Sequence, residues 1–274
     1  MKEEESPSGI LLADKPVGLS SHEMVARARR ALGVRRVGHA GTLDPFATGL
    51  LIILVGRATR LARYFVELPK TYEVVARLGA RSSTGDPEGE IEETGMVPSP
   101  LVLPRGVVRQ RPPAYSAVKV DGERAYARAR RGEAVETAER EVTVFEAEER
   151  SRTGDVVELR FVCSSGTYVR SLVADLGDAY CMELRRTAIG PFTAEGAWPG
   201  EGVAQLLDVV SAWARFGRVV ELGEDEGDAV EHGRAIAARG VEGPLLLVGG
   251  GDGGAVAVAV ERGGLLRVEV GLRG

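Results

Sequence analysis

An aspartate on a glycine-flanked loop is the residue of this sequence best suited to do chemistry. Asp44 lies in the stretch Val37 to Leu51, VGHAGTLDPFATGLL. Pro45 follows it and disfavours the α conformation at Asp44. The apolar run LLIILV, which begins at Leu50, is typical of a buried strand. A carboxylate on a stiff loop beside a buried strand suits a reactive group, although Asp before Pro is also a common turn signal.

The full stretch is far more specific than the Asp-Pro pair. GTLDPFATGLL resembles the signature of the bacterial TruB-type tRNA pseudouridine synthases. The resemblance covers roughly Ile10 to Phe192 and implies an α+β fold, with a mixed, mainly antiparallel sheet flanked by helices. The other sequence motifs of that family occur here in the same order. They are KTY from Lys70, TGDPEG within Ser82 to Glu90, PPAYSAVK from Pro112, CSSGTYVR from Cys163, LRRT from Leu184 and GPF from Gly190.

The resemblance implies an isomerisation of uridine 55 in the T-loop of tRNA to pseudouridine. The N1–C1′ bond breaks, the uracil turns, and C5 bonds to C1′. Asp44 is the implied catalytic carboxylate, either as a nucleophile at C1′ or by assisting loss of a ribose proton to give a glycal. An ordinary aspartate pKa of about 3.9 keeps it ionised at neutral pH. Because substrate and product are isomers, we expect no cofactor and no metal.

Position by position, the resemblance assigns further roles around Asp44. Arg170 would hold the carboxylate, since a guanidinium pairs with it bidentately. Tyr72 would stack on the flipped-out uracil and take part in proton removal. His39 would help to fill the place of the flipped-out base, and Leu184 would pack against the base.

Three basic residues are expected to bind the RNA. Lys15 lies in the KPVG loop, where the resemblance favours a phosphate contact over an ordinary surface lysine. Lys119 and Arg124 belong to an insertion of about 112–140, which in relatives clasps the RNA. From Glu123 the sequence predicts a helix with Arg124, Arg128 and Arg131 on one side.

Local patterns predict the elements that carry these residues. Ser20 and Glu23 have the spacing of a capping box, which starts a helix, and Met24, Ala28 and Leu32 would form its buried stripe. Residues 70–78 alternate with a period of two, as a strand does. Further strands are predicted at Ile10 to Ala13, Val142 to Phe145 and Val156 to Cys163, with helices over Thr59 to Phe65, from Tyr168 and within AQLLDVVSAWARF.

The segment Asp175 to Leu184 departs from the family. It is several residues shorter than the helix and turn usual in relatives, and Tyr180 appears in place of a common histidine. We therefore expect the helix length and some RNA contacts to differ here from those of relatives.

The C-terminal block has a different pattern from the rest of the chain. LLLVGGGDGGAVAVAVERGGLLRVEV contains two alternating apolar runs around glycine-rich turns, which predicts small antiparallel β structure. GGGDGG lacks the Lys-Ser/Thr of a phosphate loop, so a hairpin loop is favoured. The block resembles a short PUA-like RNA-binding domain. We therefore expect a disordered tail (1–8), a catalytic domain (9–218) and a PUA-like domain (219–274).

Composition is consistent with a cytoplasmic, monomeric protein. The chain has 274 residues, of which 44% are hydrophobic and 27% charged, and the start is polar rather than signal-like. Cys163 and Cys181 suggest reduced thiols, and the three histidines are too dispersed for a metal site. The net charge is −5, yet arginine clusters at 27–36 and 105–131 would attract a phosphate backbone, unless they are simply solvated helix faces.

Two rival functions remain to be tested. One is a catalytically inactive RNA-binding or RNA-folding protein on the same scaffold, and RNA folding is also a possible second activity of the enzyme. The other is a nucleoside or glycoside hydrolase that uses Asp44. That class requires a second acid–base carboxylate or a metal, and no matching word appears.

Overall fold

The computed structural model describes residues 7–113, 115–116, 118–120, 122–249 and 253–273. Within this part, only the backbone is described for Lys119, Arg124, Ala127, Ala129 and Arg130. No helix of the described part is long and apolar enough to cross a membrane.

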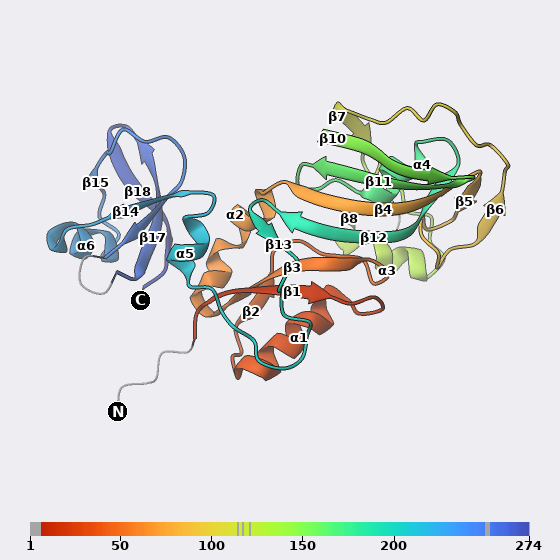
Figure 1. Cartoon of the computed structure of the whole chain (residues 1–274). Coiled ribbons are helices and arrows are strands. Elements are labelled where there is room, and N and C mark those ends of the chain that lie inside the picture. The colour runs from red at the N-terminus through yellow and green to blue at the C-terminus, as the bar shows by residue number, and fades with distance from the viewer. Residues whose placement is uncertain (1–6, 114, 117, 121, 250–252, 274) are drawn as a thin grey trace.

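The described part contains a large mixed sheet, a smaller sheet near the C-terminus and two short hairpins (Figure 1). In the large sheet the order is β1-β3-β12-β4-β11-β10-β7, with β2 beside β3 and β13 beside β12. All pairs are antiparallel except β12 with β3. The strands are β1 (Gly9–Lys15), β2 (Val37–His39), β3 (Thr48–Val55), β4 (Lys70–Leu78), β7 (Gly106–Gln110), β10 (Arg140–Thr153), β11 (Val156–Cys163), β12 (Ala179–Ile189) and β13 (Phe192–Thr193).

Short helices flank this sheet, so the predicted α+β architecture is confirmed. The predicted capping box is present at Ser20 and Glu23, and Gly33 ends the helix in a left-handed conformation. Residues 59–65 form a 3₁₀ turn that continues into a helix, as predicted. The helices are α1 (Ser21–Leu32), η1 (Gly56–Leu61), α2 (Ala62–Glu67), α3 (Ala125–Arg130), α4 (Val169–Ala174), α5 (Val209–Trp213) and α6 (Glu224–Glu231).

The strand β3 is apolar on both faces because both are covered. Leu51 and Ile53 pack with Met24 of α1. Leu50 and Ile52 pack in the cluster that contains Phe65 of α2. That cluster continues to Trp213 and to the C-terminal sheet, so the two sheets share apolar packing. This rigid strand directly follows the Asp44 loop.

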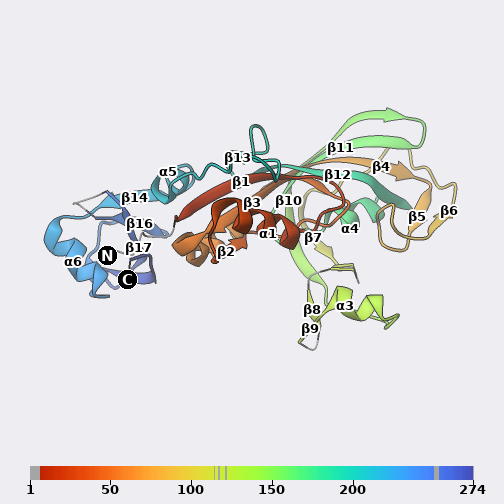
Figure 2. The ribbon, with the colours of Figure 1, turned by 90° about the horizontal axis from the view of Figure 1, so that it is seen from below.

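The C-terminal sheet has the order β14-β16-β17-β18-β15, and it lies at the opposite end of the molecule from the β5–β6 hairpin (Figures 1 and 2). The antiparallel structure predicted for the glycine-rich stretch is confirmed, since β16 pairs with β17 and β17 with β18 in that sense. The additional pair of β14 with β16 is parallel. The predicted domain boundaries stay predictions. The strands are β14 (Arg218–Glu221), β15 (Ile236–Ala237), β16 (Leu245–Val248), β17 (Ala255–Arg262) and β18 (Leu265–Gly271). Residues 250–252 of the glycine-rich run lie outside the described residues.

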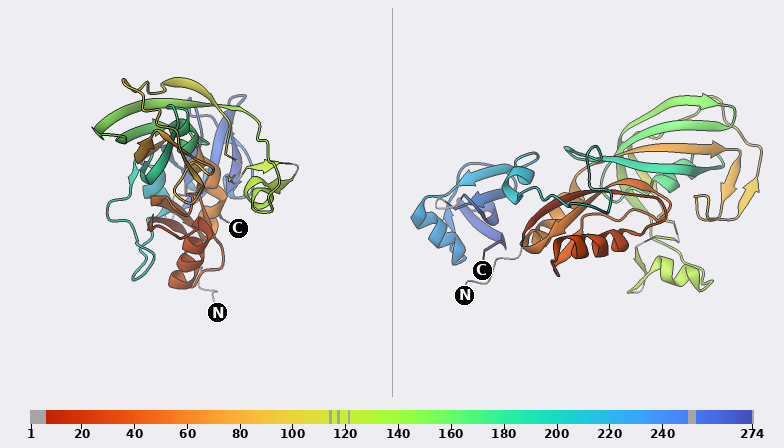
Figure 3. Two further views of the ribbon diagram at one scale, coloured as in Figure 1. Left: turned by 90° about the vertical axis from the view of Figure 1, so that its right-hand side faces the viewer. Right: turned by 60° about the horizontal axis from the view of Figure 1, so that its bottom comes forward.

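The insertion projects from the sheet as a hairpin and a short helix (Figures 2 and 3). The hairpin pairs β8 (Lys119–Val120) with β9 (Glu123–Arg124), and the other small hairpin pairs β5 (Ala80–Ser82) with β6 (Ile91–Glu93). The helix predicted from Glu123 is present, and it begins two residues later, at Ala125. Gly122, at φ +85°, turns the chain and lets Glu123 and Arg124 pair as a strand.

The structure also describes Ser8 and the shortened segment before β12. Ser8 was expected in a disordered tail, yet its hydroxyl donates to the Val55 carbonyl and accepts from the Ala58 N–H at the start of η1. Residues 1–6 lie outside the described residues. In the shortened segment, α4 ends at Ala174 and β12 begins at Ala179, so only a brief turn separates them.

Candidate active site

The loop that carries Asp44 is fastened on both sides of the aspartate. The Ser21 hydroxyl, at the start of α1, donates to the Leu43 carbonyl over 3.1 Å and accepts from the Leu43 N–H over 2.9 Å. The Gly18 N–H donates to the Pro45 carbonyl over 2.8 Å. Asp44 therefore sits on a loop with little freedom, as the sequence predicted.

Arg186 also holds the loop that carries Asp44. It is buried in β12, and its guanidinium donates to the carbonyls of Leu50, Thr42 and Gly41 over 2.8, 3.4 and 3.1 Å. Parallel pairing brings the β12 backbone so close to Gly49 that a Cβ there would lie 2.3 Å from the Arg186 carbonyl oxygen. No role for Arg186 was predicted from the sequence, because no local sequence pattern indicates that β12 pairs with β3.

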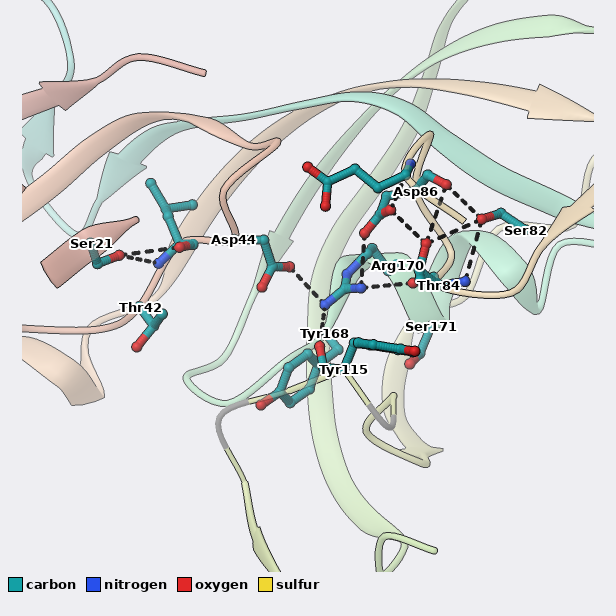
Figure 4. Close-up of polar contacts among 12 residues, drawn as sticks. Ser21, Thr42, Asp44, Ser82, Thr84, Asp86, Tyr115, Tyr168, Arg170 and Ser171 are labelled. Carbon is teal, nitrogen blue, oxygen red and sulfur yellow. Dashed lines mark hydrogen bonds and ion pairs between the residues drawn. The ribbon is translucent and has the colours of Figure 1, made fainter. Parts of the chain in front are cut away.

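Arg170 joins two carboxylates with one guanidinium (Figure 4). It lies in the first turn of α4, and its side chain is 4% exposed. One nitrogen lies 2.9 Å from the Asp44 carboxylate, and another lies 3.0 Å from Asp86. The Thr84 and Tyr115 carbonyls accept further bonds of 2.7 and 2.8 Å. Arg170 is therefore held in one orientation, as an arginine that positions Asp44 must be.

Asp86 is a site residue whose role the sequence analysis missed. The TGDPEG word matched the family, but only the structure brings Asp86 against Arg170. It is 5% exposed, and its carboxylate accepts from the Thr84 hydroxyl over 2.6 Å and from the Glu88 N–H over 3.1 Å. This buried carboxylate offsets the charge of Arg170 on the side away from Asp44.

The environment of Asp44 does not leave its pKa at the ordinary value assumed from the sequence. Desolvation raises the pKa of Asp44, the Arg170 charge opposes this shift, and the Asp86 charge adds to it. The Asp44 side chain is nevertheless 29% exposed. The carboxylate therefore reaches the cavity in front of it while most of its surface is shielded from water.

Asp44 and Arg170 open onto a cavity of about 740 Å³, which Tyr72 and Leu184 also line. Tyr72 is 8% exposed on β4, and Leu184 is 6% exposed on β12. Burial raises the pKa of Tyr72, whereas the charge of Arg186 and a hydrogen bond from it lower that pKa. The apolar Leu184 side chain and the Tyr72 phenol thus line the same cavity as the Asp44 carboxylate.

Lys15 does not have the exposure that a phosphate contact requires. It is 0% exposed, and its ammonium donates to the carbonyls of Pro16, Leu19 and Pro45 over 2.9, 2.8 and 3.2 Å. Burial lowers the pKa of Lys15 to about 8, although Asp44 opposes the shift. Because three backbone carbonyls accept hydrogen bonds from the ammonium, Lys15 holds the loop in place. The expected contact of Lys15 with phosphate is therefore corrected.

The other predicted RNA-binding residues are placed as follows. His39 ends β2, half-buried, with its ring 5.6 Å from the ring of His22. His22, rather than His39, lines the cavity. Lys119 and Arg124 occupy paired backbone positions in the β8–β9 hairpin, and their side chains lie outside the described part. Their contacts with RNA stay predictions.

Cys163 is buried, as predicted, and burial raises the pKa of its thiol to about 11. Among the described residues no group of three or more His, Cys, Asp or Glu side chains is placed to hold a metal ion.

The fold is shared with solved structures of an H/ACA RNP and of a Cbf5 complex. The chain superposes on the structure titled as an H/ACA RNP bound to a substrate RNA containing 2′-deoxyuridine, with a TM-score of 0.68, 21% identity, and coverage of 97% of this chain and 85% of that one. A Cbf5-Nop10-Gar1 complex gives a TM-score of 0.66, 24% identity, and coverage of 96% and 84%. At these identities the likeness defines the fold class, which is the pseudouridine-synthase fold.

Sequence comparison gives the family within that class. Residues 29–169 match the TruB family pseudouridylate synthase (N terminal domain). The tRNA pseudouridine synthase B of Thermobifida fusca is 43% identical, over 93% of this chain and 95% of that protein. The protein of the same name from Corynebacterium efficiens is 40% identical, over 86% of each. This chain belongs to the TruB family of pseudouridylate synthases.

Proposed function

We propose that this protein isomerises uridine 55 in the T-loop of tRNA to pseudouridine. The observation that supports this most directly is the Asp44–Arg170 pair at the wall of the cavity, 2.9 Å apart. Relatives named tRNA pseudouridine synthase B match across nearly the whole chain, which supports tRNA as the substrate. Action on tRNA favours the cytoplasm, and we propose that the protein acts as a monomer.

In the proposed mechanism the target uridine leaves its stack and enters the cavity. Flipping costs a few kcal/mol, which stacking on an aromatic ring offsets. Tyr72 supplies that ring and Leu184 contacts the base from another side. Water is excluded by the same surfaces, which strengthens the electrostatic effect of Asp44 on C1′.

Asp44 then acts as the nucleophile at C1′. The N1–C1′ bond breaks as the carboxylate bonds to C1′, and its electron pair remains on the uracil. The uracil turns, C5 bonds to C1′, and the carboxylate is released. The proton on C5 leaves last, with the Tyr72 oxygen as its proposed acceptor, and N1 takes up a proton, so the product is an isomer of the substrate. Arg170 keeps Asp44 ionised and aimed at the sugar throughout, since its charge opposes the effect of burial.

The test is conversion of an unmodified T-arm hairpin by purified protein, with pseudouridine located by chemical labelling and primer extension. One modified uridine is expected, at position 55. A hairpin with cytidine at that position is the matched control. Bound but unchanged RNA would contradict the proposal in favour of a binding protein, and free uracil with an abasic site would indicate a hydrolase.

A further inference from the structure

The two arginine clusters of the sequence differ in their electrostatic partners. In the second cluster, Arg109 and Arg111 each lie 3.6 Å from a glutamate, and Arg131 pairs with Glu123 and Glu133. The positive charge of these three arginines is therefore locally compensated. In the first cluster no salt bridge is formed within the described part of the chain by Arg27, Arg29, Arg30, Arg35 or Arg36.

Two arginines of α1 line a shallow hollow. Arg27 and Arg30 face the segment after β13, and together with Trp198, Gly200 and Glu201 they border a space of about 510 Å³. Figure 3 shows this segment running beside α1. Arg27 is half-buried and Arg30 is exposed. Glu201 is a carboxylate at the hollow, so the two arginines leave an excess of positive charge there.

The wall of the hollow is rigid. The Trp198 N–H donates to the Leu12 carbonyl over 2.9 Å, and its carbonyl accepts from the Asp14 N–H over 2.8 Å, so β1 holds the residue on both sides. The indole is 6% exposed, and its Nε1 has no hydrogen-bond partner in the described part of the chain. A Cβ on Gly200 would lie 3.3 Å from an Arg27 nitrogen, so the loop approaches the guanidinium closely.

Glu23, the acidic residue of α1, makes its hydrogen bonds within the helix cap. Its carboxylate accepts from the Ser20 N–H over 2.8 Å and from the Ser20 hydroxyl over 2.7 Å. These bonds lower the pKa of Glu23 most, and the charge of Arg27 lowers it further. Glu23 therefore offsets part of the charge of Arg27, but it forms no salt bridge with Arg27 or Arg30 in the described part of the chain.

We infer that Arg27 and Arg30 form a second RNA-contacting site, which binds phosphates of the substrate outside the catalytic cavity. The inference rests on the proposed function for the identity of the RNA. His22, at the start of α1, lines the catalytic cavity, and Arg30 follows it by about two helical turns. An RNA strand leaving the cavity along α1 therefore reaches the hollow.

A phosphodiester fits this site better than other partners. Guanidinium groups bind phosphate oxygens in a fork, and arginine is more weakly hydrated than lysine. Binding would release the counterions of the contacted phosphates, which makes affinity depend on salt. Arg27 and Arg30 therefore contribute to affinity and not to the chemical step.

The test measures the salt dependence of binding of an unmodified full-length tRNA transcript. The variant is Arg27→Gln/Arg30→Gln, and the matched control is Arg150→Gln/Arg160→Gln, which removes the same charge from arginines paired with Glu148 and Glu146. Two lost phosphate contacts should lower the slope of log Kd against log salt concentration by about 1 to 2. The single-turnover rate at saturating protein should not change.

Arg30→Glu is the second variant, since a change at this exposed position does not disturb packing, and it should weaken binding more than Arg30→Gln. An unchanged slope, or an equal fall in the control, would overturn the inference. Because binding is read separately from turnover, a wild type that binds tRNA but forms no pseudouridine would refute the proposed function alone.

Discussion

Arg170 holds Asp44 through a contact of 2.9 Å and is itself held by Asp86 at 3.0 Å. The three side chains come from the loop before β3, the loop after β5 and the start of α4. Their arrangement solves a physical problem, because a carboxylate shielded from water tends to take up a proton. One fixed cation favours the ionised form of Asp44 without covering it.

Arg170→Lys should lower the single-turnover rate by about 10²- to 10³-fold, the usual effect of removing one preorganised donor. A lysine lacks the planar guanidinium and cannot donate hydrogen bonds to Asp44, Asp86 and two carbonyls at once. The Kd for the T-arm hairpin should change by only a few-fold. A variant with a normal rate would show that Asp44 needs no guanidinium.

The rate should depend on pH through Asp44. Only the ionised carboxylate is nucleophilic, and burial raises its pKa, so the single-turnover rate should fall on acidification at a pH above the ordinary aspartate pKa of about 3.9. Asp86 contributes to the raised pKa. In Asp86→Asn the acid limb should therefore move to lower pH, and a limb that moved upward would contradict this reading.

Tyr72→Phe separates stacking from proton removal. The ring remains, so hairpin affinity should be unchanged. The hydroxyl beside Arg186 is lost, so product formation should slow by about 10²-fold, the lower range for a lost acid–base group. A Phe variant with the wild-type rate would limit Tyr72 to stacking.

Arg186→Met should destabilise the fold by about 3 kcal/mol, because it leaves the carbonyls of Gly41, Thr42 and Leu50 without their donor. Chemical denaturation measures this. The neighbouring Arg185→Met is the control. Arg185 pairs with Asp14 at a side-chain exposure of 40%, so its loss should cost less than about 1 kcal/mol. Equal effects would rule out a special role for the buried arginine.

Local patterns predicted much of the fold. The capping box at Ser20 and the buried strand after Gly49 are properties of neighbouring residues, and the structure has both. The helix predicted from Glu123 is present but begins at Ala125, because a turn at Gly122 takes Glu123 and Arg124 into a hairpin. Helical spacing could not reveal that competition.

The candidate site was only partly predictable. The family words identified Asp44, Tyr72 and Arg170, and the structure brings all three to one cavity. The contact of Asp86 with Arg170 joins residues far apart in sequence and had no local signal. Lys15 was predicted to contact phosphate because the three carbonyls that bind its ammonium come together only in the folded loop.

The most direct test of the account is tritium release from a T-arm hairpin labelled at uracil C5, with wild type and Asp44→Asn in parallel. Formation of the C5–C1′ bond must expel the tritium. We expect release by the wild type and none by Asp44→Asn, which should still bind the hairpin with similar affinity. Tritium release by Asp44→Asn at the wild-type rate, or none by a wild type that binds the hairpin tightly, would contradict it.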